Sequence, residues 1–288
     1  MDTSQKIIVV VGPTASGKSD FAVALAKKEN GEIISSDSRQ VYRGLDIGTG
    51  KITEEEMAGV PHHMIDIIDI HQSFSVADYE AIATPIIIDI LKRGKTPIIC
   101  GGTGQYIDAL IYKNTFAKVP PNEVLRRELE TKTNEELFLK LQEQDQARAE
   151  KIDKHNKVRL VRALEIIEQE GKVPVLQDAQ FRYPTEIYLL SPSKEVLRTR
   201  IETRLRKRLD LGMLEEGRRL LTENFSTKKL ASLGLEYIWM NHYLQGTYSY
   251  EEMESKLLTS IWHYAKRQMT WNKKYASLKE TIIIPVKE

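Results

Sequence analysis

The sequence has little cysteine, almost no net charge and no long apolar run. Among its 288 residues Cys100 is the one cysteine, which excludes an intrachain disulfide. The formal net charge of +1 excludes a general attraction to nucleic acid, so RNA binding would depend on local basic clusters. No apolar run approaches membrane-spanning length, and no signal-peptide pattern is present. We therefore expect a globular cytoplasmic protein with no membrane partner.

The most specific signal that is present is a complete G-x-x-x-x-G-K-S motif. It lies between an apolar run at residues 7–11 and a helical pattern at residues 21–26, which is the strand–loop–helix context of a P-loop. Backbone N–H groups of such a loop bind a di- or triphosphate, Lys18 can reach its terminal oxygens, and Ser19 can ligate an accompanying Mg²⁺ ion. Most such loops hold ATP or GTP, so the motif alone leaves the reaction open. The predicted phosphate-binding residues are Gly12, Pro13, Thr14, Ala15, Ser16, Gly17, Lys18 and Ser19.

Strand and helix patterns alternate after the motif. We expect strands at residues 32–35 and 96–100, a helix at residues 76–91, and a strand-like stretch at residues 65–68. This alternation predicts the α/β class, a P-loop NTPase-like parallel sheet flanked by helices, whose ligands lie beyond the carboxyl ends of the strands. Asp37 and the glycine-rich turn at residues 101–104 follow two of these strands, so we expect both at the same edge as the P-loop.

The pattern changes between residues 114 and 182. Charged amphipathic stretches at residues 123–131, 134–144 and 157–169 replace the strand signals and predict a helical insertion. A strand at residues 186–190, a basic helix at residues 193–221 broken near Gly212, helices around residues 235–244 and 250–275, and a last strand at residues 281–286 follow. We predict a core domain of residues 1–113 and 183–288, and an inserted helical domain of residues 114–182.

Asp37 is the sharpest catalytic candidate outside the motif. A carboxylate at this strand end can accept a proton, orient an acceptor or bind Mg²⁺ through water. An Asx turn or a helix N-cap is an equally good interpretation of an aspartate at such a junction. An acidic and histidine-rich segment could suggest a metal site, but its spacing argues against one. Adjacent histidines on an extended chain point to opposite faces, so they rarely bind the same ion. This segment contains His62, His63, Asp66, Asp69 and His71.

Basic residues concentrate in two places near the C-terminal end. The helix at residues 193–221 carries several arginines, and residues 264–274 mix cations with aromatic rings, a combination that suits phosphate contacts and base stacking. A solvated helix face with i,i+4 pairs, such as Glu202 with Arg206, is the alternative. The clusters contain Arg198, Arg200, Arg204, Arg206, Lys207 and Arg208, and then Tyr264, Lys266, Arg267, Trp271, Lys273 and Lys274.

Six segments, in order along most of the chain, resemble the tRNA dimethylallyltransferases, also called tRNA isopentenyltransferases. They are GPTASGKS (12–19), SSDSRQVYRGLDIGTGK (35–51), PHHMIDI (61–67), GGTGQY (101–106), RLVRALE (159–165) and YAKRQMTW (264–271). The resemblance implies transfer of a dimethylallyl group from dimethylallyl diphosphate to N6 of the adenosine beside the anticodon, position 37, in tRNAs that read codons beginning with U. It also implies a P-loop core with an inserted helical domain. We further expect a Mg²⁺ ion as the cofactor and a monomer.

The resemblance also assigns roles to residues. Asp37 corresponds to the general base, Lys18 and Arg204 to catalytic cations on the diphosphate, and residues 14–19 to the diphosphate loop. Positions implied to contact tRNA are Asp37, Ser38, Arg39, Gln40, Thr103, Arg126, Lys157, Val158, Arg159, Leu160 and Val161. The chain departs from the family pattern at three places: Arg208 stands where Met is usual, GGTGQY replaces GGTGLY, and LGLEY at residues 233–237 replaces IGYKE.

Three other functions stay open at this point. A P-loop kinase or NTPase would use Asp37 to bind a hydroxyl acceptor, and an adenylate isopentenyltransferase would prenylate a free nucleotide. A non-enzymatic RNA-binding switch would use its nucleotide only to order loops. The helical insertion and the basic helices favour tRNA as the acceptor.

Overall fold

The computed structural model describes residues 6–113, 117, 119–174, 180–223 and 225–286. The chain forms two compact units. The core unit comprises Met1–Ile111 and Phe181–Glu288, and the helical unit comprises Tyr112–Gln180. The boundaries predicted from the sequence, residues 114 and 182, lie within two residues of these.

A six-stranded parallel sheet forms the centre of the core unit, which confirms the predicted fold class. Its strand order is β3-β2-β4-β1-β5-β6. The strands are β1 (Ile7–Val11), β2 (Gly31–Ser35), β3 (His62–His63), β4 (Thr96–Gly101), β5 (Thr185–Pro192) and β6 (Thr281–Val286). Val11 pairs with Gly101 and Leu189, so the loops that follow β1 and β4 leave the sheet at the same edge.

The prediction of a strand at residues 65–68 was wrong. The strand in this region is instead β3, whose residues pair with Ile33 and Ile34 of β2. Met64 and Asp66 have φ of 65° and 54°, a left-handed conformation that cannot continue an extended strand. Ile68 makes only an isolated bridge to Tyr42.

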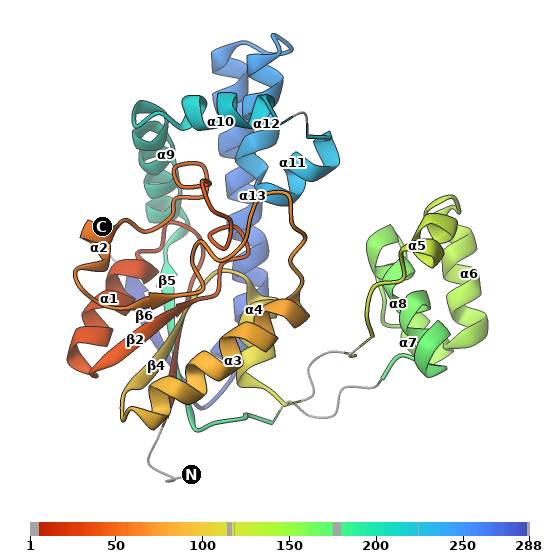
Figure 1. The fold of residues 1–288 in the computed structure, drawn as a ribbon, viewed down its shortest axis with the longest axis horizontal. Helices are drawn as coiled ribbons and strands as arrows, with labels where there is room; N and C mark the ends of the chain where they lie inside the picture. The colour runs from red at the N-terminus through yellow and green to blue at the C-terminus, as the bar shows by residue number, and fades with distance from the viewer. Residues whose placement is uncertain (1–5, 114–116, 118, 175–179, 224, 287–288) are drawn as a thin grey trace. The chain divides into compact units, whose positions relative to one another are not determined.

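Helices cover both faces of the sheet (Figure 1). Helix α1 (Lys18–Lys28) packs Ala22, Val23 and Ala26 against one face, where Val10 and Ile98 belong to the same buried cluster. Helices α3 (Val76–Lys92) and α4 (Gly104–Ile111) and the long α13 (Tyr250–Ala276) cover the other face. The one-turn helix α2 (Glu54–Met57) precedes β3. The sequence did not predict α2 or α4, because each is short.

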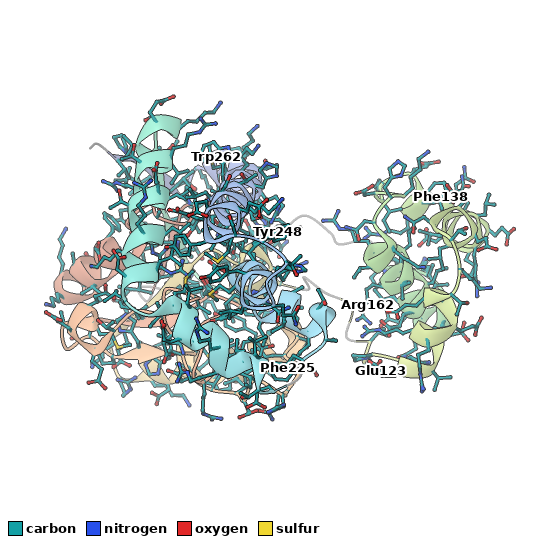
Figure 2. The ribbon with its side chains drawn as sticks, turned by 90° about the horizontal axis from the view of Figure 1, so that it is seen from above. Glu123, Phe138, Arg162, Phe225, Tyr248 and Trp262 are labelled. Carbon is teal, nitrogen blue, oxygen red and sulfur yellow. The ribbon has the colours of Figure 1, made fainter. Side chains whose placement is uncertain are left out.

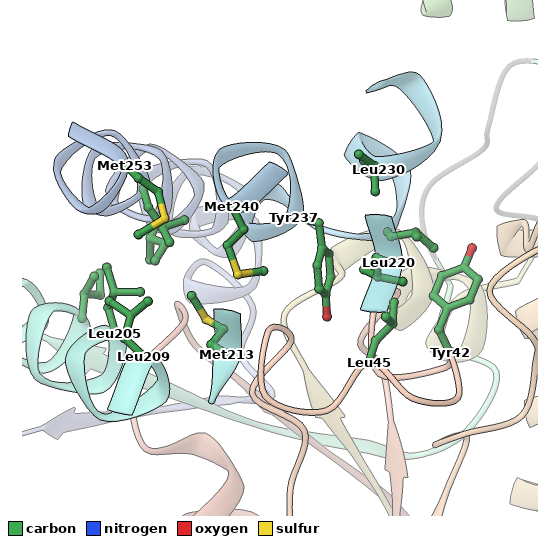
Figure 3. Close-up of a cluster of buried hydrophobic side chains, with 14 of the residues drawn as sticks. Tyr42, Leu45, Leu205, Leu209, Met213, Leu220, Leu230, Tyr237, Met240 and Met253 are labelled. Carbon is green, nitrogen blue, oxygen red and sulfur yellow. The ribbon is translucent and has the colours of Figure 1, made fainter. Parts of the chain in front are cut away.

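The C-terminal helices build a second hydrophobic cluster beside the sheet. They are α9 (Lys194–Asp210), α10 (Met213–Leu221), α11 (Thr227–Leu233), α12 (Leu235–Leu244) and α13. Gly212, with φ of 95°, separates α9 from α10, as the sequence predicted. Figure 3 shows Leu205 and Leu209 of α9 near Met213 of α10 and Met240 of α12.

The helical unit contains α5 (Glu123–Glu130), α6 (Asn134–Gln144), the single turn α7 (Gln146–Ala149) and α8 (Lys157–Glu170). Its core is formed by Leu129, Leu137, Leu141, Leu160 and Leu164. Phe138 packs against this core from α6 and is labelled in Figure 2 with Glu123 of α5 and Arg162 of α8. Asn122, Thr133 and Asn156 cap three of the helices with their side chains.

Across the described ranges, every helix is too short or too polar to cross a membrane.

Candidate active site

The glycine-rich motif forms the turn between β1 and α1. Gly17 and Ala15 have φ of 84° and 62°, and α1 begins at Lys18. A Cβ on Gly12 would lie 2.7 Å from Ser16 Oγ and 3.1 Å from the Leu190 carbonyl oxygen, so only glycine fits there. Ser16 Oγ is buried and has no hydrogen-bond partner among the described residues. The turn therefore offers a helix N-terminus and an unpartnered hydroxyl to an anion.

Two half-buried cations flank this loop. Lys18 Nζ lies 3.4 Å from the Pro13 carbonyl oxygen, and Arg204 donates to Thr14 Oγ1 (3.2 Å) and to the Gly50 carbonyl oxygen (3.0 Å). Burial lowers the pKa of both groups, because each charge is partly removed from water. Neither has a carboxylate within 4.0 Å in the part of the chain that the structure describes. Their charge is available to an anionic ligand.

Asp37 follows β2 at the same edge. Its Oδ1 accepts the Arg39 backbone N–H at 2.8 Å, so the Asx turn that competed with a catalytic role is present. Its Oδ2 has no hydrogen-bond partner among the described residues. Burial lowers the pKa of Lys18, whereas the Asp37 carboxylate acts in the opposite direction, so the two charges influence each other. Asp37 therefore both shapes its turn and keeps one oxygen free.

Thr103 connects the loop after β2 to the loop after β4. Its backbone N–H donates to the Ser36 carbonyl oxygen at 3.0 Å, and its Oγ1 accepts the Ser38 N–H at 3.0 Å. Gln40 Nε2 lies 3.4 Å from the Gly50 carbonyl oxygen, and the Arg39 guanidinium donates to the Ser232 carbonyl oxygen of α11. The core-unit residues predicted to contact tRNA are thus held in one hydrogen-bonded group of loops.

Gln268 is a site residue that sequence reasoning did not single out. It is buried on α13, where its Oε1 accepts the Thr14 N–H at 2.7 Å and its Nε2 donates to the Gly102 carbonyl oxygen at 3.1 Å. It therefore connects the P-loop to the turn that carries Thr103. The available signal was its place inside the YAKRQMTW segment, but helix spacing alone cannot say which loops a glutamine reaches.

Two predicted tRNA-binding residues of the helical unit, Arg126 and Lys157, have partners within the protein. Burial of Glu165 by itself raises the pKa of this carboxyl, but the Asn122 N–H and the Arg162 and Arg126 guanidinium groups together lower it. Arg126 Nε lies 2.9 Å from Glu165 Oε1, and Lys157 Nζ donates to the Glu130 carbonyl oxygen at 2.7 Å.

The predicted tRNA-binding stretch at the start of α8 has two kinds of side chain. Val158 is 79% exposed, and Arg159 is exposed as well. Leu160 and Val161 are buried in the core of the unit, where their side chains support α8.

The histidine-rich segment makes protein contacts. His63 Nε2 lies 2.8 Å from Glu32 Oε2 on β2, and His62 Nδ1 lies 2.8 Å from the Val60 carbonyl oxygen. No three His, Cys, Asp or Glu side chains gather into a metal-binding group in the described ranges.

The fold and this site define a P-loop α/β protein in which Lys18 and Arg204 lie beside the loop and Asp37 follows a strand at the same edge of the sheet. The chain belongs to the IPP transferase family, whose model matches residues 40–275.

Named relatives and solved structures agree with this assignment. A tRNA dimethylallyltransferase of Anoxybacillus flavithermus is 41% identical, with 93% of this chain and 87% of that protein covered. One of Halalkalibacterium halodurans is 40% identical, covering 95% and 90%. The full-length tRNA isopentenylpyrophosphate transferase of Bacillus halodurans superposes with a TM-score of 0.72 at 38% identity, covering 98% and 90%. A eukaryotic dimethylallyltransferase acting on tRNA has a TM-score of 0.87 at 27% identity, covering 99% and 75%.

Proposed function

We propose that this protein is a tRNA dimethylallyltransferase. It transfers the dimethylallyl group of dimethylallyl diphosphate to N6 of adenosine 37, beside the anticodon, in tRNAs reading codons that begin with U. The products are N6-dimethylallyladenosine and diphosphate. The relatives named above support the reaction, and their tRNA substrates support tRNA over a free adenine nucleotide.

One observation carries the proposal at the level of chemistry. Two cations lie beside each other at this site, Lys18 of the P-loop and Arg204 of α9, and neither has a carboxylate partner among the described residues. At the neighbouring strand end, Asp37 keeps one carboxylate oxygen without a hydrogen bond to any described residue. Cations without a carboxylate partner suit a leaving diphosphate, and a carboxylate with a free oxygen suits an amine that must lose a proton.

The reaction follows from these groups. The bond between the allylic carbon and the diphosphate oxygen breaks, and the electron pair leaves with the diphosphate. The loop N–H groups, Lys18 and Arg204 stabilise the charge that this group gains. The adenine N6 forms the new carbon–nitrogen bond, and Asp37 accepts the proton that N6 loses. The base must leave its stack to reach a donor held in this loop.

A Mg²⁺ ion fits the first turn of α1. Ser19 is exposed there, and its hydroxyl makes no hydrogen bond with any described residue. Ser19 would ligate the ion, which would neutralise part of the diphosphate charge. The loop residues Gly12, Pro13, Ala15 and Gly17 would contribute backbone geometry.

Both units supply groups suited to tRNA. Ser38, Arg39, Gln40 and Thr103 surround Asp37 in the core unit, and we assign them to the extruded adenosine and its neighbours. In the helical unit, the side chains open to a phosphate backbone are Lys157, Val158 and Arg159. Arg126 is paired with Glu165, so it would position its neighbours more than it would attract phosphate. We propose a monomer, and we place it in the cytoplasm with its tRNA substrate.

The test is to incubate the protein with radiolabelled dimethylallyl diphosphate, Mg²⁺ and unmodified tRNA, with AMP and ATP as competing acceptors. We expect label in tRNA at an adenosine next to the anticodon and no stoichiometric consumption of ATP. Label in AMP or ATP in preference to tRNA would instead establish a free-nucleotide transferase. Phosphoryl transfer from ATP, with no prenylated RNA, would establish a kinase.

A further inference from the structure

A tight turn at residues 46–50 lies directly against Arg204. The Gly50 carbonyl oxygen accepts a hydrogen bond from Arg204 Nη2 at 3.0 Å. Gly50 has φ of 61°, and a Cβ at this position would overlap the guanidinium group. The position of this turn therefore decides where the guanidinium lies relative to Thr14 of the P-loop.

Glu216 of α10 holds the turn by its N–H groups. This side chain is 2% exposed. Its Oε2 accepts the N–H groups of Asp46 and Ile47 at 2.8 Å each, and its Oε1 accepts the Gly48 N–H at 2.7 Å. The Tyr237 hydroxyl also donates to Oε1 at 2.7 Å, and Figure 3 shows this hydroxyl pointing away from α12. One carboxylate thus fixes three consecutive peptide groups.

Arg208 of α9 holds the same turn by its carbonyl groups. Its side chain is buried, and its Nε donates to the Ile47 carbonyl oxygen at 2.6 Å. Its Nη2 donates to the Gly48 carbonyl oxygen and lies 3.3 Å from Glu236 Oε1. Glu216 and Arg208 are complementary, because Glu216 binds the N–H groups of the turn and Arg208 binds its carbonyl groups.

Arg208 also contacts Glu236 of α12, whose Oε1 lies 3.3 Å from its Nη2. Burying an arginine without a partner lowers the stability of the folded protein, and Glu236 supplies a carboxylate for this one. Glu236 therefore supports the guanidinium group that holds the turn.

We propose that Arg208 and Glu216 are positioning residues for the transfer reaction. They fix the turn at residues 46–50, whose Gly50 carbonyl oxygen holds the Arg204 guanidinium against the P-loop. The inference rests on the proposed function in that Arg204 acts on the diphosphate. Neither residue touches the substrate, so both act through Arg204.

The experiment is a double-mutant cycle. Arg208→Met and Glu216→Gln are each made in the parent protein and in an Arg204→Ala background, and single-turnover transfer is measured at saturating donor and tRNA. We expect each change to lower the rate by about 10–100-fold in the parent, because a misplaced group of this kind costs about that much. In the Arg204→Ala background we expect no further loss beyond about twofold, because residues that act through one group are not additive.

The chain offers matched controls. Arg218→Met and Glu215→Gln remove the same charges from exposed positions of α10. We expect both variants to stay within about twofold of the parent rate. Loss of the same factor in both Arg204 backgrounds would overturn the proposal, because a general effect on folding does not depend on Arg204.

Arg208→Lys covers the case in which Arg208→Met does not fold. Lysine keeps the charge but has no planar fork to donate to both carbonyl oxygens. A rate within twofold of the parent for this variant would also overturn the proposal.

Binding of inorganic pyrophosphate separates this inference from the proposed function. Even if the parent transfers no prenyl group, Arg208→Met must weaken pyrophosphate binding in the parent and leave it unchanged in the Arg204→Ala background.

Discussion

The charged groups around the P-loop and the buried carboxylate of the helical unit are partnered in opposite ways. In the core unit, Lys18 and Arg204 contact only carbonyl and hydroxyl oxygens among the described residues, and Asp37 keeps one oxygen free. In the helical unit, the buried Glu165 binds two arginines and a backbone N–H. The first arrangement leaves charge for a ligand, and the second uses its charge to hold helices together. Substitutions in the two units should therefore affect different quantities.

Asp37→Asn gives the largest effect on catalysis. Asparagine can still make the Asx turn with Arg39, but it accepts a proton poorly and presents a donor to the adenine amine. We expect single-turnover transfer to fall by about 10²–10⁴-fold with an unchanged Tm. A rate within a few-fold of the parent at saturating tRNA and donor would remove Asp37 from the mechanism and leave only its role in the turn.

Lys18→Met removes a cation that has no carboxylate partner in the described part of the chain. We expect kcat/KM for the donor to fall by about 10²–10³-fold, as for loss of one preorganised charge-stabilising group. Binding of pyrophosphate, measured by calorimetry, should weaken as well. Thermal unfolding should show an equal or higher Tm, because burial already disfavours the charged form of Lys18. A large drop in Tm would show that Lys18 is structural.

Glu165→Gln should lower the stability of the helical unit, whereas Lys18→Met should lower activity. It removes the carboxylate that binds Arg126, Arg162 and the Asn122 N–H, and hydrogen bonds to a charged group contribute about 1.5–3 kcal/mol. We expect the free energy of opening of the helical unit to fall by about 2–3 kcal/mol, measured by hydrogen exchange of the α5 and α8 amides in the full chain. Amides of β1 and β4 provide the internal control and should keep their protection.

The pH dependence of the helical unit follows from the same carboxylate. The folded-state pKa of Glu165 lies below its unfolded value, because the Asn122 N–H and two arginines outweigh burial. Its stabilisation is therefore complete above the unfolded pKa, about 4.3, and is lost as the pH falls through the folded pKa. Protection of α5 and α8 should decline on acidification below that value in the parent and decline less in Glu165→Gln. An identical acid response in both proteins would contradict the assignment.

The smallest effect concerns salt. Arg159 is exposed, so neutralising it should remove about one unit from the slope of log affinity for tRNA against log salt. Arg126 lies within 4.0 Å of two carboxylates, Glu123 and Glu165, so Arg126→Gln should leave that slope nearly unchanged. Fluorescence anisotropy with labelled tRNA over a range of KCl concentrations measures both. Equal changes in slope would remove the distinction between free and partnered cations in this unit.

Local patterns in the sequence determined much of this protein. The motif at residues 12–19 contains its own strand, turn and helix signals, so the P-loop could be predicted without tertiary information. The resemblance carried by longer segments led to the family. The strand at residues 65–68 was mispredicted, because the sequence does not reveal that Met64 and Asp66 adopt a left-handed conformation.

Only the tertiary structure decided which charges are free and which are partnered. Arg126 and Arg204 look alike as basic residues on amphipathic helices, but one lies beside Glu165, 39 positions away, and the other beside Thr14, 190 positions away. Gln268 reaches Thr14 across 254 positions, and Glu216 reaches the turn at Gly48 across 168. Helical spacing determines which face a side chain occupies, whereas its partner depends on how distant segments pack. The sequence by itself therefore determined the P-loop, and the packing of α9, α10 and α13 decided which side chains complete the candidate site.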